Sequence, residues 1–289
     1  MTSLRKIKKD LAMVSTIGSI VNVYQKTAYL KMMKIRESVL MNREFTAEIA
    51  KVYHYVKESY LASLNKIYRK NKKNYFLKKK REKGLIFLSA NQFFYGNLIL
   101  DIWSQVYNLW KKEDLDLIIV GKIGRYLAKS YGMSKSSFYY FNLDDANPKK
   151  EEIGAIVDFI KDYEEVIVFH GRFRTILSQV VAKSSIKGNV SEKDLKIPEK
   201  IKKYLFEPSP EAVFEFFETE IMASLLHQAI LEHSLAKYAT RMVAMYKAGE
   251  NAKKIKKEME IIKKKLEWQE INKTQVEFFN AFSLWNSKK

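Results

Sequence analysis

The sequence predicts an α+β protein in which long N- and C-terminal helices form an antiparallel coiled coil and a central α/β domain separates them along the chain. Three observations predict this fold class. Apolar residues recur at alternating three- and four-residue spacing through both ends of the chain. All four prolines lie between residues 148 and 210, so both ends lack the strongest helix breaker. Between the ends, short β-rich segments alternate with helical ones.

The N-terminal helix is expected over residues 1–65. Its apolar seam keeps a heptad spacing for five heptads, and Gly18 and Gln25 fill the two gaps. Basic residues lie off the seam, so the helix presents one apolar stripe and a positive exterior, and it cannot be stable alone. The seam comprises Leu4, Ile7, Leu11, Val14, Val21, Ala28, Met32, Ile35 and Val39, and continues more weakly through Ile49, Tyr53, Val56 and Tyr60.

The middle of the chain predicts a basic linker over residues 66–83 and an α/β domain over residues 84–206. Strand–helix alternation at this spacing is typical of a mostly parallel, Rossmann-like sheet with helices on both faces. Strands are expected at 84–90, 116–122, 137–143 and 164–171, with a final one near 203–206, and helices near 93–112, 123–131 and 149–162.

A second long helix is expected over residues 207–289. Its spacing slips near Lys256, where Ile255 and Met259 take over, and such a stutter locally unwinds a supercoil. Because the two terminal segments carry matching seams, each is the simplest partner for the other, in antiparallel orientation. The second seam comprises Phe217, Ile221, Leu231, Leu235, Tyr238, Met242, Met245, Gly249, Ala252, Met259, Ile262 and Leu266.

The charge balance calls for an anionic partner. The chain has 289 residues, 52 Lys plus Arg against 33 Asp plus Glu, and a formal net charge of +19. The excess positive charge lies in residues 1–36, 65–83 and 247–273, whereas the rest of the chain is balanced. Cysteine is absent, which excludes a disulfide scaffold, a thiolate metal site and a cysteine nucleophile. No secretory signal and no membrane-spanning segment is visible, so a cytoplasmic protein is expected.

No catalytic, cofactor-binding or metal-binding constellation is expected in this chain. The segment Gly121–Arg125 contains only G-x-x-G, and neither a dinucleotide fingerprint nor a P-loop occurs. These glycines are therefore interpreted as turn residues. Ser89 lacks a nucleophile elbow. The four histidines, which are not at metal-binding spacing, are His54, His170, His227 and His233.

The basic segments leave three interpretations open: contact with a nucleic-acid backbone, with an anionic membrane surface, or with an acidic protein surface. Phosphate and base recognition favours arginine forks, but lysine dominates the basic residues of this chain. Binding of nucleic acid is therefore not expected. A basic coiled-coil protein that binds nucleic acid or an anionic membrane remains the alternative.

Several motifs resemble those of one family, the gamma subunit of F-type ATP synthases. Residues 231–245 are similar to the family signature S-E-x-x-A-R-M-V-A-M, and residues 248–252 (AGENA) stand where the family has A-T-D-N-A. Residues 204–210 resemble the family's Y-x-Y-E-P-x-P, and residues 3–8 resemble its opening S-L-R-x-I-K. The resemblance spans nearly the whole chain and is strongest over residues 204–252.

The resemblance implies a central shaft that turns inside a ring of alternating alpha and beta subunits, where ATP is hydrolysed or made. The chain itself would have no catalytic residue and no cofactor. Its partners would be the alpha and beta subunits, an epsilon-like subunit and a membrane rotor, at the inner face of the plasma membrane. Rotor–stator contacts are expected at Arg241, Met242, Met245, Asn251, Lys265, Tyr24 and Lys26, and contacts of the foot with other rotor parts at Tyr204, Phe206 and Glu207.

Three segments depart from the family's pattern. The loop S-D-R-G-L-C-G-G reads Ser89 to Asn97 (SANQFFYGN) here, T-K-A-M-x-M reads VNVYQK at 21–26, and K-x-R-Q reads KLEW at 265–268. Together with the lysine-rich, glycine-poor composition, these departures favour a diverged paralogue that serves an F-like ATPase in a bacterium of the mollicute type.

Overall fold

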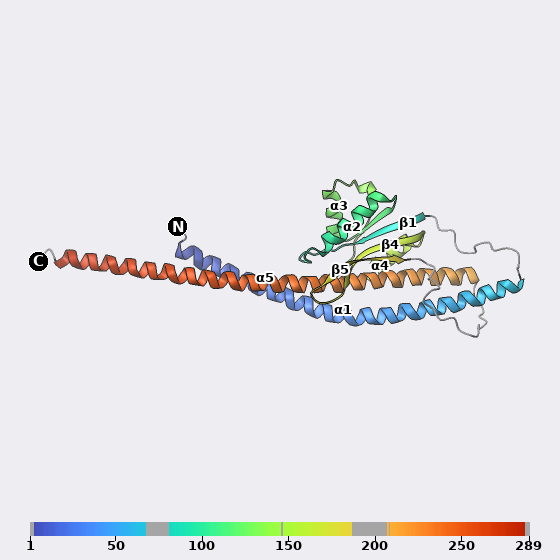
Figure 1. The fold of residues 1–289 in the computed structure, drawn as a ribbon, viewed down its shortest axis with the longest axis horizontal. Coiled ribbons are helices and arrows are strands. Elements are labelled where there is room, and N and C mark those ends of the chain that lie inside the picture. The colour runs from blue at the N-terminus through green and yellow to red at the C-terminus, as the bar shows by residue number, and fades with distance from the viewer. Residues whose placement is uncertain (1–2, 68–80, 146, 187–206, 208, 287–289) are drawn as a thin grey trace. The chain divides into compact units, whose positions relative to one another are not determined.

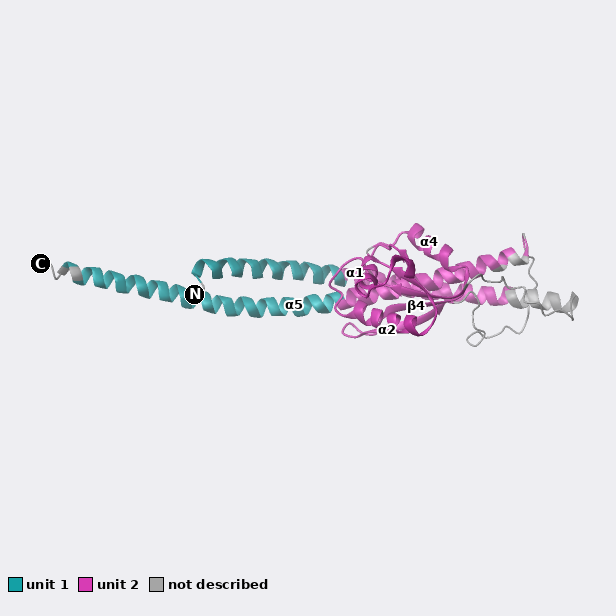
Figure 2. Cartoon of the chain, turned by 90° about the horizontal axis from the view of Figure 1, so that it is seen from above, with its two compact units in different colours: residues 1–29, 241–289 teal, residues 30–240 magenta. Residues whose placement is uncertain are grey.

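The computed structural model describes residues 3–67, 81–145, 147–186, 207 and 209–286. The chain divides into two compact units, unit 1 with residues 1–29 and 241–289 and unit 2 with residues 30–240 (Figure 2). Most of the predicted basic linker and the strand expected near 203–206 lie outside the described residues. Figure 1 shows the two long helices, α1 (Leu4–Ile67) and α5 (Pro210–Asn286). Each contributes residues to both units.

The predicted seam of α1 is confirmed from Leu4 to Val56, and Tyr60 lies outside the residues whose side chains are described. Each of its expected members from Leu4 to Val39, Gly18 and Gln25 included, is buried or half-buried. The seam then continues through Asn42 and Thr46, two polar residues that the apolar pattern passed over. Thr46 Oγ1 lies 2.6 Å from Ser224 Oγ, and Asn42 Nδ2 donates to Gln228 Oε1 at 2.9 Å.

The two helices run antiparallel within each unit. In unit 1, a Cβ atom on Gly18 would lie 3.9 Å from Ala252 Cβ, and one on Gly249 would lie 3.7 Å from Val21 Cγ1. Within unit 2, residues 42 and 46 of α1 meet residues 228 and 224 of α5. Residue numbers rise along one helix as they fall along the other, so the expected antiparallel pairing is confirmed.

The seam of α5 is confirmed for most of its length, with one correction after the stutter. Ile221, Leu235, Tyr238, Met245 and Ala252 are buried, but Ile262 is 45% exposed. The predicted members Met259 and Leu266 are half-buried, but between them Lys263 takes the position expected for Ile262. A lysine can take this position because its aliphatic stem covers apolar surface while its ammonium group stays in water.

Unit 2 contains one five-stranded sheet in the order β3-β2-β1-β4-β5. The first four strands are parallel and match the predicted ones: β1 (Arg81–Leu88), β2 (Asp116–Val120), β3 (Tyr139–Phe141) and β4 (Tyr163–Phe173). The fifth, β5 (Gln179–Ile186), pairs antiparallel with β4. The sequence did not predict it, since QVVAKSSI combines one short apolar run with a polar second half.

Helices cover both faces of this sheet, as expected. Alternate residues of β1 point to opposite faces, so Leu85 and Phe87 join one apolar core and Ile86 and Leu88 the other. The first core lies under α2 (Leu98–Lys112) and α3 (Lys122–Ser130), which a 3-10 turn (Lys135–Ser137) follows. The second lies under α4 (Lys150–Ile160) and residues 222–230 of α5.

Within unit 2, the long helix α5 is therefore a layer of the α/β domain as well as a partner of α1. Every residue of α5 from 217 to 240 is buried or half-buried, although a coiled-coil seam alone would cover only one stripe. No helix in the described part of the chain is long and apolar enough to cross a membrane.

Candidate functional site

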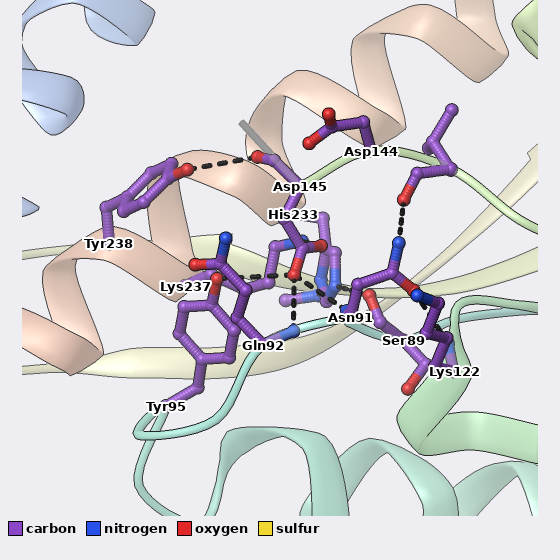
Figure 3. A network of polar contacts seen from close by, with 12 residues as sticks. Ser89, Asn91, Gln92, Tyr95, Lys122, Asp144, Asp145, His233, Lys237 and Tyr238 are labelled. Atoms are coloured by element: carbon purple, nitrogen blue, oxygen red, sulfur yellow. Dashed lines mark hydrogen bonds and ion pairs between the residues drawn. The ribbon is translucent and has the colours of Figure 1, made fainter. Parts of the chain in front are cut away.

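Polar side chains of α5 fill the edge of the sheet where ligands bind in related architectures. The carboxyl ends of four parallel strands meet there, and the strand order reverses between β1 and β4. In open α/β sheets a crevice at this position is the usual binding site for a ligand. In this chain Lys237, His233 and Tyr238 of α5 point into it, together with loop residues that follow β1 and β3 (Figure 3).

Asp145, which follows β3, is the centre of this network. Its Oδ2 accepts hydrogen bonds from the backbone N–H groups of Asn91 and Gln92, at 2.7 and 2.9 Å, and from the Tyr95 hydroxyl at 3.4 Å. Its Oδ1 accepts a hydrogen bond from Lys237 Nζ at 2.5 Å, and both side chains of this ion pair are 4% exposed. The carboxylate of Asp145 therefore occupies the anion-binding position that the loop after β1 creates.

The N-terminus of α3 also has an internal partner. Asn91 Oδ1 accepts a hydrogen bond from Lys122 N at 2.8 Å, while Asn91 Nδ2 donates to the carbonyl of Leu143. Gly121 has a φ of 106°, and a Cβ there would lie 2.9 Å from Ala90 N. The chain makes this turn only because residue 121 is a glycine. The geometry agrees with a turn rather than with a phosphate-binding loop.

The space that remains at this edge is too small for a nucleotide. The cavity between Ser89, Gly121, Asp145, His233 and Lys237 has a volume of about 10 Å³. Ligand pockets are generally of the order of hundreds of Å³. The cavity has room for about one water molecule.

Two buried histidines hold the same edge together as neutral hydrogen-bonding groups. His233 Nδ1 accepts a hydrogen bond from Gly171 N at 3.0 Å, which places the proton on Nε2, and Nε2 donates to the carbonyl of Ser89 at 2.9 Å. Burial, and then the charge of Lys237, holds the pKa of His233 well below its ordinary value. Burial likewise lowers the pKa of His170, whose Nε2 lies 2.8 Å from Ser184 Oγ.

Glu232 connects three layers of unit 2. Its carboxylate accepts hydrogen bonds from Arg43 of α1 at 2.7 Å, from Arg172 of β4 at 3.1 Å and from Gln228 at 2.9 Å. Burial alone would raise the pKa of Glu232, but these three donors outweigh it, so the pKa lies below its ordinary value. The carboxylate stays charged and bonded to both neighbouring layers.

The expected rotor–stator residues do not form one cluster. Arg241 is 6% and Met245 is 7% exposed, and Met242 is half-buried, so their side chains pack inside the helix assembly. The others are exposed on α1 and α5: Tyr24, Lys26, Asn251 and Lys265. Of the expected foot contacts, Glu207 is exposed, whereas Tyr204 and Phe206 lie outside the described residues.

Sequence reasoning missed the residues that make the most specific contacts in unit 2: Asp145, Glu232, His233 and Lys237. A signal was present, because the segment around residues 232–237 carries two charged residues and a histidine close to the apolar seam positions. It did not reveal the partners, which lie as far as 189 positions away in the chain. Among the described residues, no group of three side chains that could hold a metal ion lies together.

Known proteins whose sequences resemble this chain are described as ATP synthase or as its gamma chain. The family described as ATP synthase matches residues 3–275. The ATP synthase gamma chain of Buchnera aphidicola subsp. Schizaphis graminum is 27% identical over 281 residues, 92% of each chain. That of Haemophilus ducreyi is 22% identical and covers 91% of this chain and 92% of its own.

Solved structures share the fold. The match to the central stalk/c-ring of the Tetrahymena thermophila mitochondrial ATP synthase has a TM-score of 0.57 and 18% identity, and covers 79% of this chain and 99% of that chain. The match to the OSCP/F1/c-ring structure of the Euglena gracilis mitochondrial ATP synthase has a TM-score of 0.52 and 13% identity, and covers 89% and 95% of the two chains.

Proposed function

The chain belongs to the ATP synthase gamma family, and from this membership we propose that it is the central rotor shaft of an F-type or F-like rotary ATPase. The shaft is a non-catalytic subunit. It couples ATP hydrolysis or synthesis in a ring of alpha and beta subunits to rotation. The observation that carries the proposal is the family match over nearly the whole chain, combined with an antiparallel pair of long helices.

Exposed apolar residues support a protein partner for the C-terminal end of α5. Within unit 1, five aromatic side chains near this end are each more than half exposed: Trp268, Phe278, Phe279, Phe282 and Trp285. A run of exposed large apolar side chains on a soluble helix is typical of an interaction site. We assign it to a contact with the alpha–beta ring.

The rotor–stator contacts are proposed at the exposed members of the expected set. Tyr24, Lys26, Asn251 and Lys265 lie on the surface of α1 and α5, where a surrounding subunit can reach them. The burial of Arg241 favours a packing role for it within the helix pair.

The remaining partners follow from the relatives. The structural neighbours belong to a central stalk/c-ring and to an OSCP/F1/c-ring, so we propose a membrane rotor as the partner of the foot domain. An epsilon-like subunit and a position at the inner face of the plasma membrane are part of the same proposal. The departures at residues 21–26, 89–97 and 265–268 favour a paralogous F-like ATPase over an ordinary F-type enzyme as the complex that this chain serves.

Affinity purification of the tagged chain from its own cells, followed by mass spectrometry, tests this function. Alpha and beta subunits in stoichiometric amounts are expected, with ATP hydrolysis by the purified complex. Recovery of nucleic acid or lipid without ring subunits would instead support the alternative, a basic coiled-coil protein bound to nucleic acid or to an anionic membrane.

A further inference from the structure

The contacts between α5 and the sheet domain of unit 2 are directional, and they are distributed around the helix. We propose that Glu232, His233, Lys237, Tyr238 and Thr240, here called the polar joint, fix the rotational angle of α5 in this domain and transmit torque between them. This inference rests on the proposed function as a rotor shaft. It assigns to the residues of the polar joint the role of holding α5 at one angle in the sheet domain.

The residues of the polar joint point in several directions. In an α-helix each residue turns the side-chain direction by about 100°. His233, Lys237 and Thr240 therefore point to one side, within about 60° of each other. Glu232 lies about 80° beyond one edge of this group and Tyr238 about 100° beyond the other, so the joint spans roughly 240° of the helix circumference.

The partners of the joint belong to different segments of the domain. His233 bonds to Gly171 in β4 and to the carbonyl of Ser89 after β1. Lys237 and Tyr238 bond to the carboxylate and the carbonyl of Asp145, the latter at 3.0 Å. Figure 3 labels Ser89, Asp145, His233, Lys237 and Tyr238 and shows the contact between Tyr238 and Asp145 as a dashed line.

The other two members extend the joint beyond this loop region. Glu232 bonds to Arg172 in β4, and Thr240 Oγ1 donates to Gln179 Oε1 in β5 at 2.9 Å. A rotation of α5 about its axis would therefore lengthen hydrogen bonds on both sides of the helix at once.

A purely apolar contact would not define this angle as sharply. Hydrogen bonds weaken steeply when their geometry is distorted, whereas apolar contacts are non-directional. A buried ion pair gives little net stability relative to apolar residues of similar volume, so stability alone does not account for Lys237 and Asp145. Fixing one geometry does account for them. At Gly171 the backbone of β4 also lies close to α5, since a Cβ on this glycine would be 3.1 Å from Ala236 Cβ.

Hydrogen exchange on the isolated full chain tests the joint without any assumption about function. The test variant is Asp145→Asn with Lys237→Met, which removes the charges but leaves no unpaired one. Its matched control is Asp158→Asn with Lys161→Met, which removes an exposed ion pair of 3.1 Å from the same domain. The amide of Gly171 donates to His233, so its exchange rate reports opening of the joint.

We expect about tenfold faster exchange at Gly171 in the joint variant, with little change at Val168 in the core of β4 and none in the control. Equal Gly171 exchange in joint and control variants would overturn the proposal. Should the double variant fail to fold, Glu232→Gln provides the same comparison, because it weakens the bonds to Arg43 and Arg172 and retains the side-chain volume.

Rotation under load tests the torque. The chain has no cysteine, so Tyr126→Cys on α3, at a position that is 72% exposed, gives a single attachment point in this chain for a probe on the sheet domain. In the purified complex, the joint variant should hydrolyse ATP but stop rotating the probe at high viscous load, whereas the control variant continues.

The outcomes separate the two proposals. Identical load dependence of joint and control variants contradicts the torque-bearing joint and leaves the shaft function standing. Absence of ATP-driven rotation in the complex with the labelled but otherwise unmodified chain contradicts the shaft function itself.

Discussion

Single side chains decide how the long helix is attached to the sheet domain. Lys237 and Asp145 are 92 positions apart in the chain, yet they form an ion pair in which both side chains are only 4% exposed. The motif that relates this chain to its family carries a glutamate where this chain has Lys237. A lysine at this position requires a carboxylate close by, and Asp145 supplies it.

His233 predicts a pH dependence of stability. Its pKa is lowered in the folded chain, whereas in the unfolded chain it is ordinary, about 6.5. The unfolded state therefore binds the proton more readily. The stability from neutral His233 is present above pH about 6.5 and is lost as the pH falls below it, by at most about 1.4 kcal/mol per pH unit.

The measurement is the free energy of unfolding from denaturant titrations between pH 5 and 8. His233→Asn, which can retain an acceptor near Gly171 N, should be less stable at pH 7 and should show a flatter slope below pH about 6.5. Burial also lowers the pKa values of His170 and His227, so these two histidines still contribute to the pH dependence of stability in the variant. Identical slopes for the parent and the variant would contradict the assignment.

Two glycines of unit 2 should respond oppositely to alanine. At Gly171 a methyl group would lie 3.0 Å from Leu98 Cδ2 and 3.1 Å from Ala236 Cβ, so Gly171→Ala should destabilise the chain by about 1–3 kcal/mol. At Gly154, inside α4, nothing lies within 4 Å, and Gly154→Ala should stabilise it by about 0.5–1 kcal/mol. Thermal melting of both variants checks this, and a loss at Gly154 as large as that at Gly171 would be the contrary result.

At the scale of elements, α1 combines an apolar seam with one polar layer. Asn42 and Thr46 lie on the seam within unit 2 and bond to Gln228 and Ser224 of α5. Buried polar residues in a helix pair specify register, because a shifted pairing leaves them without partners. We interpret this layer as the element that aligns the two helices.

Neighbouring methionines test the seam. Met32 is 5% exposed and Met33 is 42% exposed, so one residue type occurs at adjacent positions with opposite environments. Met32→Asp should cost about 3 kcal/mol or more, because it buries a charge without a partner. Met33→Asp should stay within about 0.5 kcal/mol of the parent. Chemical denaturation distinguishes them, and equal losses would place the seam elsewhere.

An engineered disulfide tests the antiparallel pairing in unit 1. The Cβ separation of 3.9 Å at Gly18 and Ala252 lies within the range that disulfides adopt, which is about 3.5–4.5 Å. Gly18→Cys with Ala252→Cys should therefore cross-link on mild oxidation, with a mobility shift on non-reducing gels. The pair Ser19→Cys with Ala252→Cys is the control, since residue 19 points about 100° away. Comparable cross-linking of the two pairs would contradict this register.

At the scale of the whole molecule, the described residues leave no space for a nucleotide at the strand ends of the sheet. The carboxyl ends of the parallel strands, where α/β domains generally bind ligands, are filled by Asp145 and by side chains of α5.

The isolated chain should therefore not bind Mg-ATP with micromolar affinity, whereas the complex should hydrolyse ATP. Calorimetric titration of the purified chain, beside an ATPase assay of the complex, measures both. Inorganic phosphate serves as the control for nonspecific attraction of anions to the net charge of +19. This attraction should weaken as the salt concentration rises. Saturable, Mg-dependent binding of ATP to the chain alone would show that the crevice opens.

The sequence was sufficient to predict the fold class and most of the helices and strands. Heptad spacing predicted the buried positions of α1 because side chains three and four residues apart share a helix face. Four parallel strands followed from short β-rich runs between helical ones. It was insufficient for β5, whose second half is polar, and for Ile262, which is exposed because Lys263 takes its place between Met259 and Leu266.

What the sequence determined by itself is the set of local periodicities and the absence of nucleotide and catalytic motifs, because both are properties of neighbouring residues. Only the tertiary structure decided that residues 217–240 are covered on all sides, that Asp145 pairs with Lys237, and that Glu232 joins α1 to β4. The physical reason is that a periodic pattern reports burial against one neighbour. A helix packed between two layers needs partners that the folded sheet brings to it from distant parts of the chain.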